Sequence, residues 1–436
     1  MKILKFGGTS VGTPQRIQKL AEIVQNEESC IVVLSAMAGT TNALVEITEF
    51  LYKGDDENAL QKIGDLEKSY ISRVKELYTS DKYLSKGLEL INSHFVYIRN
   101  FVHKTFAQLQ ERAVLAQGEL ISTAMFHYHL EENHIDSVLL PALNFMRIDK
   151  DGEPDSYYIQ ENLKRELSQH TQTKLFITQG YICRNAYGEV DNLHRGGSDY
   201  SASLIGVAIS AEEVQIWTDI DGFHNNDPRY VEDTYAISEL SFDEAAELAY
   251  FGAKIMHPAS VLPCKLSNIP VRLKNTLSPI DEGTLISPKL NHKRIKAVAA
   301  KDGITAVKIK SGRMLLAYGF IRKIFEVFEI YRTPIDMITT SEVAVSLTID
   351  DTSRLKEIEA ELEKLGTVEI DNNQSIICIV GDFISEASGS AKLVFEALEE
   401  TPLRMISYGG SDHNISVLVD QEDKVSALNS LNKLFK

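Results

Sequence analysis

The first fifty residues contain one local pattern twice, and this repetition constrains the fold more than any other feature of the sequence. In each copy, residues 1–12 and residues 31–41, a short apolar strand leads into a turn of small residues, and a helix is expected to follow. Pro14 favours the first turn of a helix that runs to about Gln25. Strand–turn–helix units in succession predict an α/β fold with a largely parallel sheet.

The rest of the chain divides by composition. Residues 51–115 are rich in Lys, Glu and Leu at helical spacing, which predicts a helical insertion. From about residue 296, segments in which apolar residues alternate as in strands are interspersed with segments of helical spacing. We therefore expect a first domain at 1–295 and a second at 296–436. In the first domain, strands are expected to resume near residues 138–140, 175–178 and 214–218.

One segment of the second domain occurs twice. The sequence TPIDMI at 333–338 returns as TPLRMI at 401–406, and each copy leads into a strand that ends in an aspartate, Asp350 or Asp420. A period of about 70 residues is too long for a solenoid repeat and predicts a duplicated small α+β domain. Chance similarity of two short segments is the alternative.

The charge balance limits the partners of the chain. The net charge of −17 repels nucleic acid and anionic membranes, so we expect neither as a partner. No apolar run approaches the roughly 18 residues of a membrane helix and no signal peptide is evident, which predicts a cytoplasmic protein. The same negative field repels nucleotides and acidic metabolites, so a site for them needs local cations. The candidates lie in turns marked by glycine or proline: Lys5, Arg195, Arg229 and Lys254.

The turn after the first strand is typical of a phosphate site. Gly7 and Gly8 allow backbone N–H groups to approach a phosphate closely. Lys5 is expected at the carboxyl edge of the sheet, where ligands bind in open α/β folds. The sequence is not a Walker A loop, because Thr13 stands in place of the lysine, and it is not GxGxxG. For the glycines alone, a plain tight turn is the alternative.

A second Gly-Gly turn follows an arginine. Arginine binds carboxylates and phosphates through two parallel hydrogen bonds, so Arg195 before Gly196 and Gly197 is interpreted as an anion clamp. Ser198 and Asp199 open the helix that follows. They are candidate site residues, with simple N-capping of that helix as the alternative.

Two further motifs carry charge. Asp219 and Asp221 follow a buried strand, where they can organise Mg²⁺ or a nucleotide, although acids before a glycine also occur for local reasons. Lys254 lies in a loop-like context. The histidines lack metal-ligand spacing, and we predict no metal held directly by protein side chains. Cations in such turns suit phosphoryl transfer, where catalysis is mostly positioning and charge neutralisation.

Together these motifs resemble one family. The sequence closely resembles aspartokinases over nearly its whole length, in the order and spacing of that family, and the tail resembles the lysine-sensitive, monofunctional branch. The motifs are KFGGTSV at 5–11, GTTNAL at 39–44, GELIS at 118–122, RGGSDYSA at 195–202, WTDIDGF at 217–223, DPR at 227–229, FGAKIMHP at 251–258 and TTSEV at 339–343.

The resemblance implies a fold and a reaction. The fold is an amino-acid-kinase sandwich followed by tandem ferredoxin-like α+β ACT domains. The reaction is transfer of a phosphoryl group from ATP, with Mg²⁺, to L-aspartate, giving 4-phospho-L-aspartate. This is the first step of lysine, threonine and methionine biosynthesis, and feedback inhibition by L-lysine is implied. ACT domains commonly pair across sheets, so a homodimer is implied and a tetramer stays open.

The resemblance also implies residue roles. Lys5 and Asp199 are catalytic, and Lys5 stabilises the charge of the transferring phosphate. A carboxylate nucleophile is already ionised at pH 7, so no general base is required. The implied contacts are Lys5, Gly7, Gly8, Ser10, Thr218, Asp219, His224, Arg229 and Lys254 for ATP; Thr41, Glu119 (at the α-ammonium), Arg195, Gly196, Gly197 and Ser198 for aspartate; and Met314, Gly319, Phe320, Ile321, Asp336, Thr340, Ser341 and Glu342 for lysine.

Two positions depart from the family pattern. His224 stands where a tyrosine is usual in the nucleotide-side loop, and Ala317 stands where a serine is expected in the effector segment. The alternatives are a related kinase for glutamate, acetylglutamate, carbamate or UMP, and a catalytically dead amino-acid sensor. Glu119 with Arg195 favours aspartate as the acceptor, and retention of Lys5, Asp199 and Lys254 argues against a dead enzyme.

Overall fold

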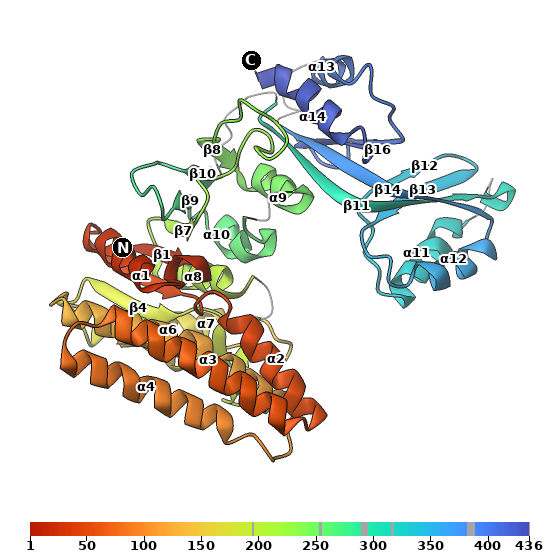
Figure 1. The fold of residues 1–436 in the computed structure, drawn as a ribbon. Helices are drawn as coiled ribbons and strands as arrows, with labels where there is room; N and C mark the ends of the chain where they lie inside the picture. Colours follow the sequence, from red (N-terminus) through yellow and green to blue (C-terminus); the bar gives the residue numbers. More distant parts are fainter. Residues whose placement is uncertain (194–195, 253–254, 289–294, 315–317, 382–388, 436) are drawn as a thin grey trace. The chain divides into compact units, whose positions relative to one another are not determined.

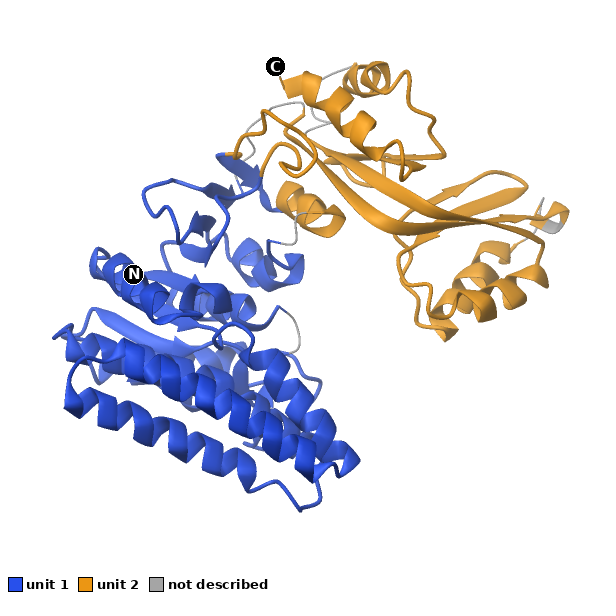
Figure 2. Cartoon of the chain, in the orientation of Figure 1, with its two compact units in different colours: residues 1–223, 238–242, 255–289 blue, residues 224–237, 243–254, 290–436 orange. Residues whose placement is uncertain are grey.

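The computed structural model describes residues 1–436 except 194–195, 253–254, 289–294, 315–317, 382–388 and 436. The chain forms two compact units (Figure 2). Two segments before residue 290, 224–237 and 243–254, pack with the C-terminal unit. The domain boundary at 295/296 that the sequence suggests stays a prediction. Unit 1 comprises residues 1–223, 238–242 and 255–289, and unit 2 comprises residues 224–237, 243–254 and 290–436.

Unit 1 is built on an eight-stranded sheet in the order β3-β4-β2-β1-β7-β9-β10-β8. All neighbouring strands are parallel except β9 and β10, which confirms the predicted largely parallel sheet. The strands are β1 Lys2–Phe6, β2 Cys30–Leu34, β3 Val138–Leu140, β4 Leu175–Gln179, β7 Val214–Thr218, β8 Glu239–Ser241, β9 Val271–Asn275 and β10 Thr284–Ser287, and a separate hairpin pairs β5 Ile182–Arg184 with β6 Val190–Asn192.

Helices cover both faces of this sheet (Figure 1). Leu4 and Phe6 of β1 join a core that includes residues of α1 to α4 and α6. On the opposite face, α8 approaches so closely that a Cβ at Gly206 would lie 2.6 Å from Val214. Of the helices in the described part of the chain, none is long and apolar enough to cross a membrane. The helices of unit 1 are α1 Pro14–Gln25, α2 Thr40–Lys53, α3 Asp56–Leu77, α4 Asp81–Arg99, α5 Gln108–Leu115, α6 Gln117–Glu132, α7 Ser156–Ser168, α8 Gly197–Ile209 and α10 Leu262–Leu266.

The segment predicted as a helical insertion holds α3, α4 and α5. Asp55 caps α3 by accepting a hydrogen bond from the N–H of Asn58 (3.3 Å), and Ser80 caps α4 through the N–H of Tyr83 (3.5 Å). The apolar faces of α3 and α4 pack into the same core as β1. The insertion is therefore continuous with the body of unit 1.

Unit 2 is built on a six-stranded antiparallel sheet in the order β12-β13-β11-β14-β16-β15. Two apolar cores form on it, one with α11 and α12 and one with α13 and α14. Its elements are α9 Phe242–Phe251 (whose first residue belongs to unit 1), β11 Ala297–Lys310, α11 Phe320–Ile330, β12 Ile338–Thr340, β13 Ala344–Ile349, α12 Leu355–Glu363, β14 Thr367–Val380, α13 Ser390–Ala397, β15 Met405–Tyr408, β16 Asn414–Asp420 and α14 Lys424–Asn432.

The two α+β repeats of unit 2 interleave through the long strands β11 and β14. Lys301 pairs with Ile376 and Ala306 pairs with Asp371, so the two strands stay paired side by side through both halves of the sheet. The first half of β11 packs with β16, and its second half packs with β13. The structure therefore contains the duplicated α+β domain that the sequence predicts.

Candidate active site

The carboxyl ends of four adjacent strands, β4, β2, β1 and β7, carry most of the predicted site within unit 1. The strands are in register, with Phe6 beside both Leu34 and Trp217. The N–H of Gly7 donates to the carbonyl of Trp217 (3.3 Å), and the N–H of Gly180 donates to the carbonyl of Leu34 (2.9 Å). This edge of an open parallel sheet is where ligands bind in such folds.

Lys5 and Asp199 form an ion pair at this edge. Side chains alternate across a strand, so Lys5 projects toward the face that carries α8. Its Nζ lies 2.6 Å from Oδ1 of Asp199, and the two side chains are 12% and 14% exposed. The pair places a mostly buried cation beside Gly7, where a Cβ would lie 3.7 Å from the Lys5 Nζ.

The N-capping alternative for Ser198 and Asp199 is wrong. Helix α8 begins at Gly197, and Gly196 is its N-cap residue. Both glycines adopt positive φ, 64° for Gly196 and 50° for Gly197, which glycine tolerates better than other residues. The helix therefore begins two residues earlier than a Ser198 cap would allow, and Asp199 in its first turn pairs with Lys5 instead.

The two glycine turns of the first fifty residues contact each other. A Cβ at Gly8 would lie 2.7 Å from the carbonyl oxygen of Ala36, so only glycine fits there. The N–H of Ala38 donates to the carbonyl of Gly8 (3.0 Å). The turn after β1 is thereby fixed to the turn after β2, which leads into Thr41.

Two helices, α2 and α8, begin near this edge with a glycine at the N-cap position. The N-cap of α2 is Gly39, and that of α8 is Gly196. Glycine has no side chain to cover the first N–H groups of a helix, and these groups with the helix dipole favour an anion. Thr41 and Ser198 lie in the first turns of the two helices, as a site for an acidic substrate requires.

Glu119 is a buried carboxyl beside the second turn. It lies in the first turn of α6, is 5% exposed, and accepts a hydrogen bond from the N–H of Ala36 (3.1 Å). Burial raises the pKa of Glu119 to about 7, while the bond from Ala36 lowers it. An ammonium group at this carboxyl would favour its charged form.

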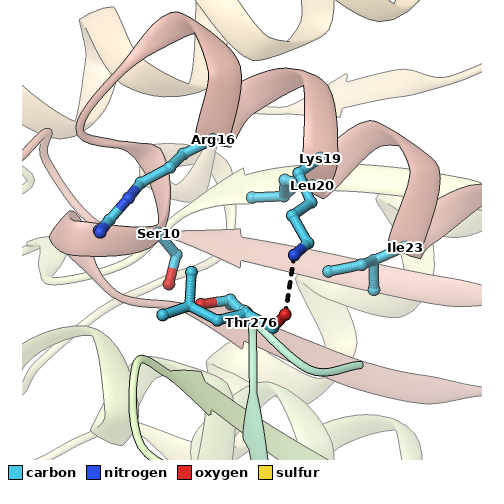
Figure 3. A pocket seen from close by; sticks show the side chains of 7 residues that line it. Ser10, Arg16, Lys19, Leu20, Ile23 and Thr276 are labelled. Carbon is cyan, nitrogen blue, oxygen red and sulfur yellow. Dashed lines mark hydrogen bonds between the residues drawn. The ribbon is translucent and has the colours of Figure 1, made fainter. Parts of the chain in front are cut away.

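Ser10 lies apart from this group, in a pocket between α1 and the segment after β9 (Figure 3). Ser10 is 3% exposed, and its Oγ has no hydrogen-bond partner among the described residues. Lys19 donates to the carbonyl of Leu277 (2.9 Å) across the same pocket. Thr276 donates from its N–H (2.8 Å) and Oγ1 (2.9 Å) to the carbonyl of Thr218, which fixes the end of β7.

The remaining predicted nucleotide residues are distributed over both units. Thr218 donates to Oδ1 of Asp219 in unit 1 (3.2 Å). His224 and Arg229 belong to unit 2, where His224 Nδ1 lies 3.2 Å from Thr234 Oγ1 and Arg229 binds the carboxylate of Asp227. Arg195 and Lys254 lie outside the described residues.

The predicted effector residues all belong to the first repeat of unit 2. Gly319 caps α11 with a φ of 79°, Phe320 is buried and Ile321 is exposed. Met314 packs against the core of that repeat, Thr340 pairs with Val345, and Ser341 and Glu342 are exposed. Ala317, the departure from the family pattern, lies outside the described residues.

Asp336 already has cationic and hydroxyl partners. Its side chain is 1% exposed, and its Oδ1 lies 2.8 Å from Lys301 Nζ and 2.7 Å from the hydroxyl of Tyr250. The Lys301 ammonium also lies 2.8 Å from Asp350 Oδ2. In the second repeat, the segment TPLRMI places Arg404 at the corresponding position, and it pairs with Asp420 (3.0 Å).

Sequence reasoning did not find Lys301, Tyr250 or Tyr70. None of them belongs to a family motif quoted above, and each meets its partner across a long sequence separation. For Tyr70 the available signal was a large polar aromatic side chain on the apolar face of a predicted amphipathic helix, because a buried tyrosine hydroxyl usually needs a partner.

Comparison with known proteins agrees with this geometry. The amino acid kinase family matches residues 1–275, and the ACT domain matches residues 377–435. Lysine-sensitive aspartokinase 3 of Escherichia coli is 35% identical over 442 residues, covering 98% of each chain. Aspartokinase 1, chloroplastic, of Arabidopsis thaliana is 31% identical, covering 99% of this chain and 80% of that protein.

Solved structures match the whole chain. Escherichia coli aspartokinase III in complex with lysine and aspartate (T-state) gives a TM-score of 0.86 at 33% identity, and its complex with aspartate and ADP (R-state) gives 0.81 at 33%. Clostridium acetobutylicum aspartate kinase gives 0.87 at 26%, and all three matches cover 100% of both chains. The motifs, the paired Lys5 and Asp199 at the carboxyl edge of the sheet, and these matches show that the chain belongs to the aspartokinase family.

Proposed function

We propose that this chain phosphorylates the side-chain carboxylate of L-aspartate with ATP. The observation that carries the proposal is the group at one sheet edge: the Lys5–Asp199 pair, two glycine-capped helix N-termini and the buried Glu119. The relative from Escherichia coli binds aspartate and ADP with the same fold, which supports these two substrates. The products are ADP and 4-phospho-L-aspartate, the first intermediate of lysine, threonine and methionine biosynthesis.

The reaction needs no proton transfer. A carboxylate oxygen of aspartate attacks the γ-phosphorus of ATP, the bond from that phosphorus to the bridging oxygen breaks, and ADP leaves with the electron pair. The aspartate side chain is ionised at neutral pH because its ordinary pKa is about 4. Catalysis then consists of alignment and of charge stabilisation on the transferring group.

The residues divide these tasks. Lys5 supplies the positive charge for the transferring phosphoryl group, and Asp199 holds Lys5 in place through their 2.6 Å contact. Gly7 and Gly8, which carry no side chains, let the backbone of this turn approach the phosphates closely. Glu119 receives the α-ammonium of aspartate. The remaining aspartate contacts that we propose are Thr41, Arg195, Gly196, Gly197 and Ser198, and those for ATP are Ser10, Thr218, Asp219, His224, Arg229 and Lys254.

The site also fits Mg²⁺ carried by ATP. Mg²⁺ binds oxygen ligands and commonly takes one or two carboxylates together with substrate phosphates, and it neutralises their charge. Asp199 and Asp219 are carboxylates near the ends of β1 and β7. Among the described residues, no group of three or more His, Cys, Asp or Glu side chains could hold a metal ion.

The direct test is trapping of the acyl phosphate with hydroxylamine. Purified enzyme with MgATP should give a hydroxamate with L-aspartate and far less with glutamate, N-acetylglutamate or carbamate, and it should form no UDP from UMP. A preference for another acceptor would show that the family assignment is right and the proposed substrate is wrong. No phosphorylation of any acceptor would favour an amino-acid sensor.

Glu119 should determine aspartate affinity and its pH dependence. Glu119→Gln keeps the shape but removes the charge, and hydrogen bonds to charged groups contribute about 1.5–3 kcal/mol, so the aspartate KM should rise at least about tenfold while the ATP KM stays unchanged. Because burial raises the pKa of Glu119 to about 7, wild-type kcat/KM for aspartate should fall as pH drops through 7. Glu119→Gln should lose this step.

The control for this prediction is Glu131→Gln on the same helix. Glu131 pairs with Lys86 at the surface (2.6 Å), so this variant should keep the aspartate KM and the pH profile. A Glu119→Gln enzyme that raises only the ATP KM would contradict the assignment. The pKa of Glu119 rises from 4.5 to about 7 on folding, so the folded protein holds a proton there that the unfolded chain has lost. The free energy of unfolding should therefore fall as pH rises from 4.5 to about 7.

We further propose feedback inhibition by L-lysine at the first repeat of unit 2, with a homodimer formed through the ACT repeats and a tetramer as a possible higher assembly. Exposed apolar side chains at and before α11, among them Tyr318, Ile321 and Ile330, support a covered face there. The first repeat places an acid, Asp336, where the second places Arg404. Lys301 and Tyr250 engage its Oδ1, and its buried Oδ2, which has no hydrogen-bond partner among the described residues, is the atom that we propose for an ammonium ligand. The effector contacts that we propose are Met314, Gly319, Phe320, Ile321, Asp336, Thr340, Ser341 and Glu342.

Lysine titration of the activity should locate this site. Allosteric coupling is typically about 1–3 kcal/mol, so saturating lysine should weaken substrate affinity about 5–150-fold. We expect this inhibition within the millimolar range of lysine, and a weaker effect of threonine. Asp336→Ala and Thr340→Ile should reduce sensitivity, and Arg404→Ala, the matched change in the second repeat, should retain it. If both first-repeat variants keep wild-type sensitivity, lysine binds elsewhere.

A further inference from the structure

We infer that the hydroxyl of Tyr70, on helix α3 of the helical insertion, positions the aspartate pocket by holding the first residue of α2. The inference rests on the proposed function, because it concerns the pocket that Thr41 and Glu119 form for aspartate. It makes Tyr70 a positioning residue that does not touch the substrate. It also gives the insertion a role in substrate affinity in addition to its role in the core.

The contact itself is short and fully buried. The Tyr70 hydroxyl lies 2.7 Å from Oγ1 of Thr40, and the two residues are 0% and 1% exposed. Thr40 is the first residue of α2, directly before Thr41. Burial raises the pKa of Tyr70 to about 12, so the phenol keeps its proton across the working pH range.

The turn from β2 into α2 is held from two other sides. On one side it contacts Gly8, through the carbonyl of Ala36 and the N–H of Ala38. On the other side, a Cβ at Gly118 would lie 2.7 Å from Ala36 Cβ and 3.3 Å from Thr40 Cγ2, which shows how closely α6 approaches. The same face of α6 carries Glu119, whose carboxylate accepts the N–H of Ala36.

Tyr70 provides the third support of this turn. It makes the one hydrogen bond of the Thr40 side chain that is found among the described residues. A buried hydroxyl that loses its partner turns toward another acceptor, and in the first turn of a helix the nearby backbone carbonyls compete for it. Such a rotation shifts α2 relative to α6, and it changes the separation of Thr41 from Glu119.

The ring of Tyr70 is held independently of its hydroxyl. Its centroid lies 5.9 Å from that of Phe95, and the Arg73 guanidinium carbon lies 5.3 Å from the ring centre. A phenylalanine at position 70 keeps these contacts. The substitution Tyr70→Phe therefore removes the hydrogen bond to Thr40 and little else.

The test compares the two Michaelis constants. Tyr70→Phe should raise the aspartate KM about two- to tenfold, the range that corresponds to loss of one neutral hydrogen bond, and it should leave the ATP KM close to wild type. The thermal midpoint should fall only by the small amount expected from the loss of one buried hydrogen bond. Thr40→Val should give the same selective change. The double variant should add nothing further, because both changes remove one bond. Thr40→Ser keeps the hydroxyl, so this variant should have the aspartate KM of the wild type.

Tyr78→Phe is the matched control. Tyr78 is also buried, at the end of α3, and its hydroxyl donates to the carbonyl of Met125 on α6 (2.8 Å), away from the turn. This variant removes an equivalent bond and should leave the aspartate KM unchanged. Two results would overturn the inference alone, provided that the wild type phosphorylates aspartate. In the first, Tyr70→Phe and Tyr78→Phe have the same aspartate KM. In the second, Tyr70→Phe raises the aspartate KM and the ATP KM by the same factor. A wild type that forms no acyl phosphate from aspartate would overturn the proposed function and the inference together.

Discussion

Replacing Lys5 with alanine is expected to lower kcat about 10²–10³-fold while the fold is retained. The ammonium group of Lys5 lies at the carboxyl end of β1, beside Gly7 and 2.6 Å from Asp199. Removing one preorganised donor that faces developing charge typically lowers the rate by this factor. Because Lys5 acts mainly in the transition state, kcat and kcat/KM should fall together, and the aspartate KM should change little.

Two further variants separate catalysis from stability in this experiment. Lys2→Ala removes a lysine from the opposite end of the same strand, where Lys2 pairs with Glu27 (2.9 Å), and it should keep full activity. Lys5→Ala deprives Asp199 of its cation, so the double variant Lys5→Ala/Asp199→Asn should recover thermal stability without recovering kcat. A Lys5→Ala enzyme with normal circular dichroism and wild-type kcat would remove Lys5 from the mechanism.

The fold was predictable from the sequence wherever local signals agree with tertiary packing. The predicted helix at 14–25 is α1, and strands appear at the three predicted places in the first domain. The repeat at 333–338 and 401–406 correctly indicated a duplicated domain. The interleaving of the repeats was not predictable, because it depends on the pairing of β11 with β14 across some 70 residues, which short-range periodicity does not encode.

The candidate site was predictable where a motif places a charge at a strand end. Lys5 and Asp199 form an ion pair, although Asp199 belongs to a helix almost two hundred residues away, and their catalytic roles stay a prediction. The start of α8 was predicted wrongly, because the positive φ of Gly196 and Gly197 is a property of the folded chain. The contact of Tyr70 with Thr40 was not predictable, because Tyr70 belongs to no quoted motif, although Thr40 lies in GTTNAL at 39–44.

The buried ion pair of Lys296 and Glu244 was not predicted either, and its disruption is expected to have the largest effect on stability. Lys296 Nζ lies 2.7 Å from Glu244 Oε2, with side chains 3% and 0% exposed, and both residues belong to unit 2. Removing one partner of a buried pair leaves the other charge buried without its counter-ion. Lys296→Met should therefore lower the free energy of unfolding of this unit by about 3–5 kcal/mol.

The measurement must follow unit 2, because Trp217, the single tryptophan, belongs to unit 1. Urea unfolding followed by far-ultraviolet circular dichroism should show an earlier transition for Lys296→Met than fluorescence does. The matched control is Lys310→Met at the last residue of β11, the strand that begins directly after Lys296. Lys310 pairs with Glu369 at 2.5 Å, but both side chains are nearly half exposed, so the expected loss is at most about 1 kcal/mol. The double variant Lys296→Met/Glu244→Gln should regain much of the lost stability, because two neutral side chains replace the pair without leaving an isolated charge. If Lys296→Met is no less stable than Lys310→Met, the ion pair of Lys296 and Glu244 does not stabilise unit 2.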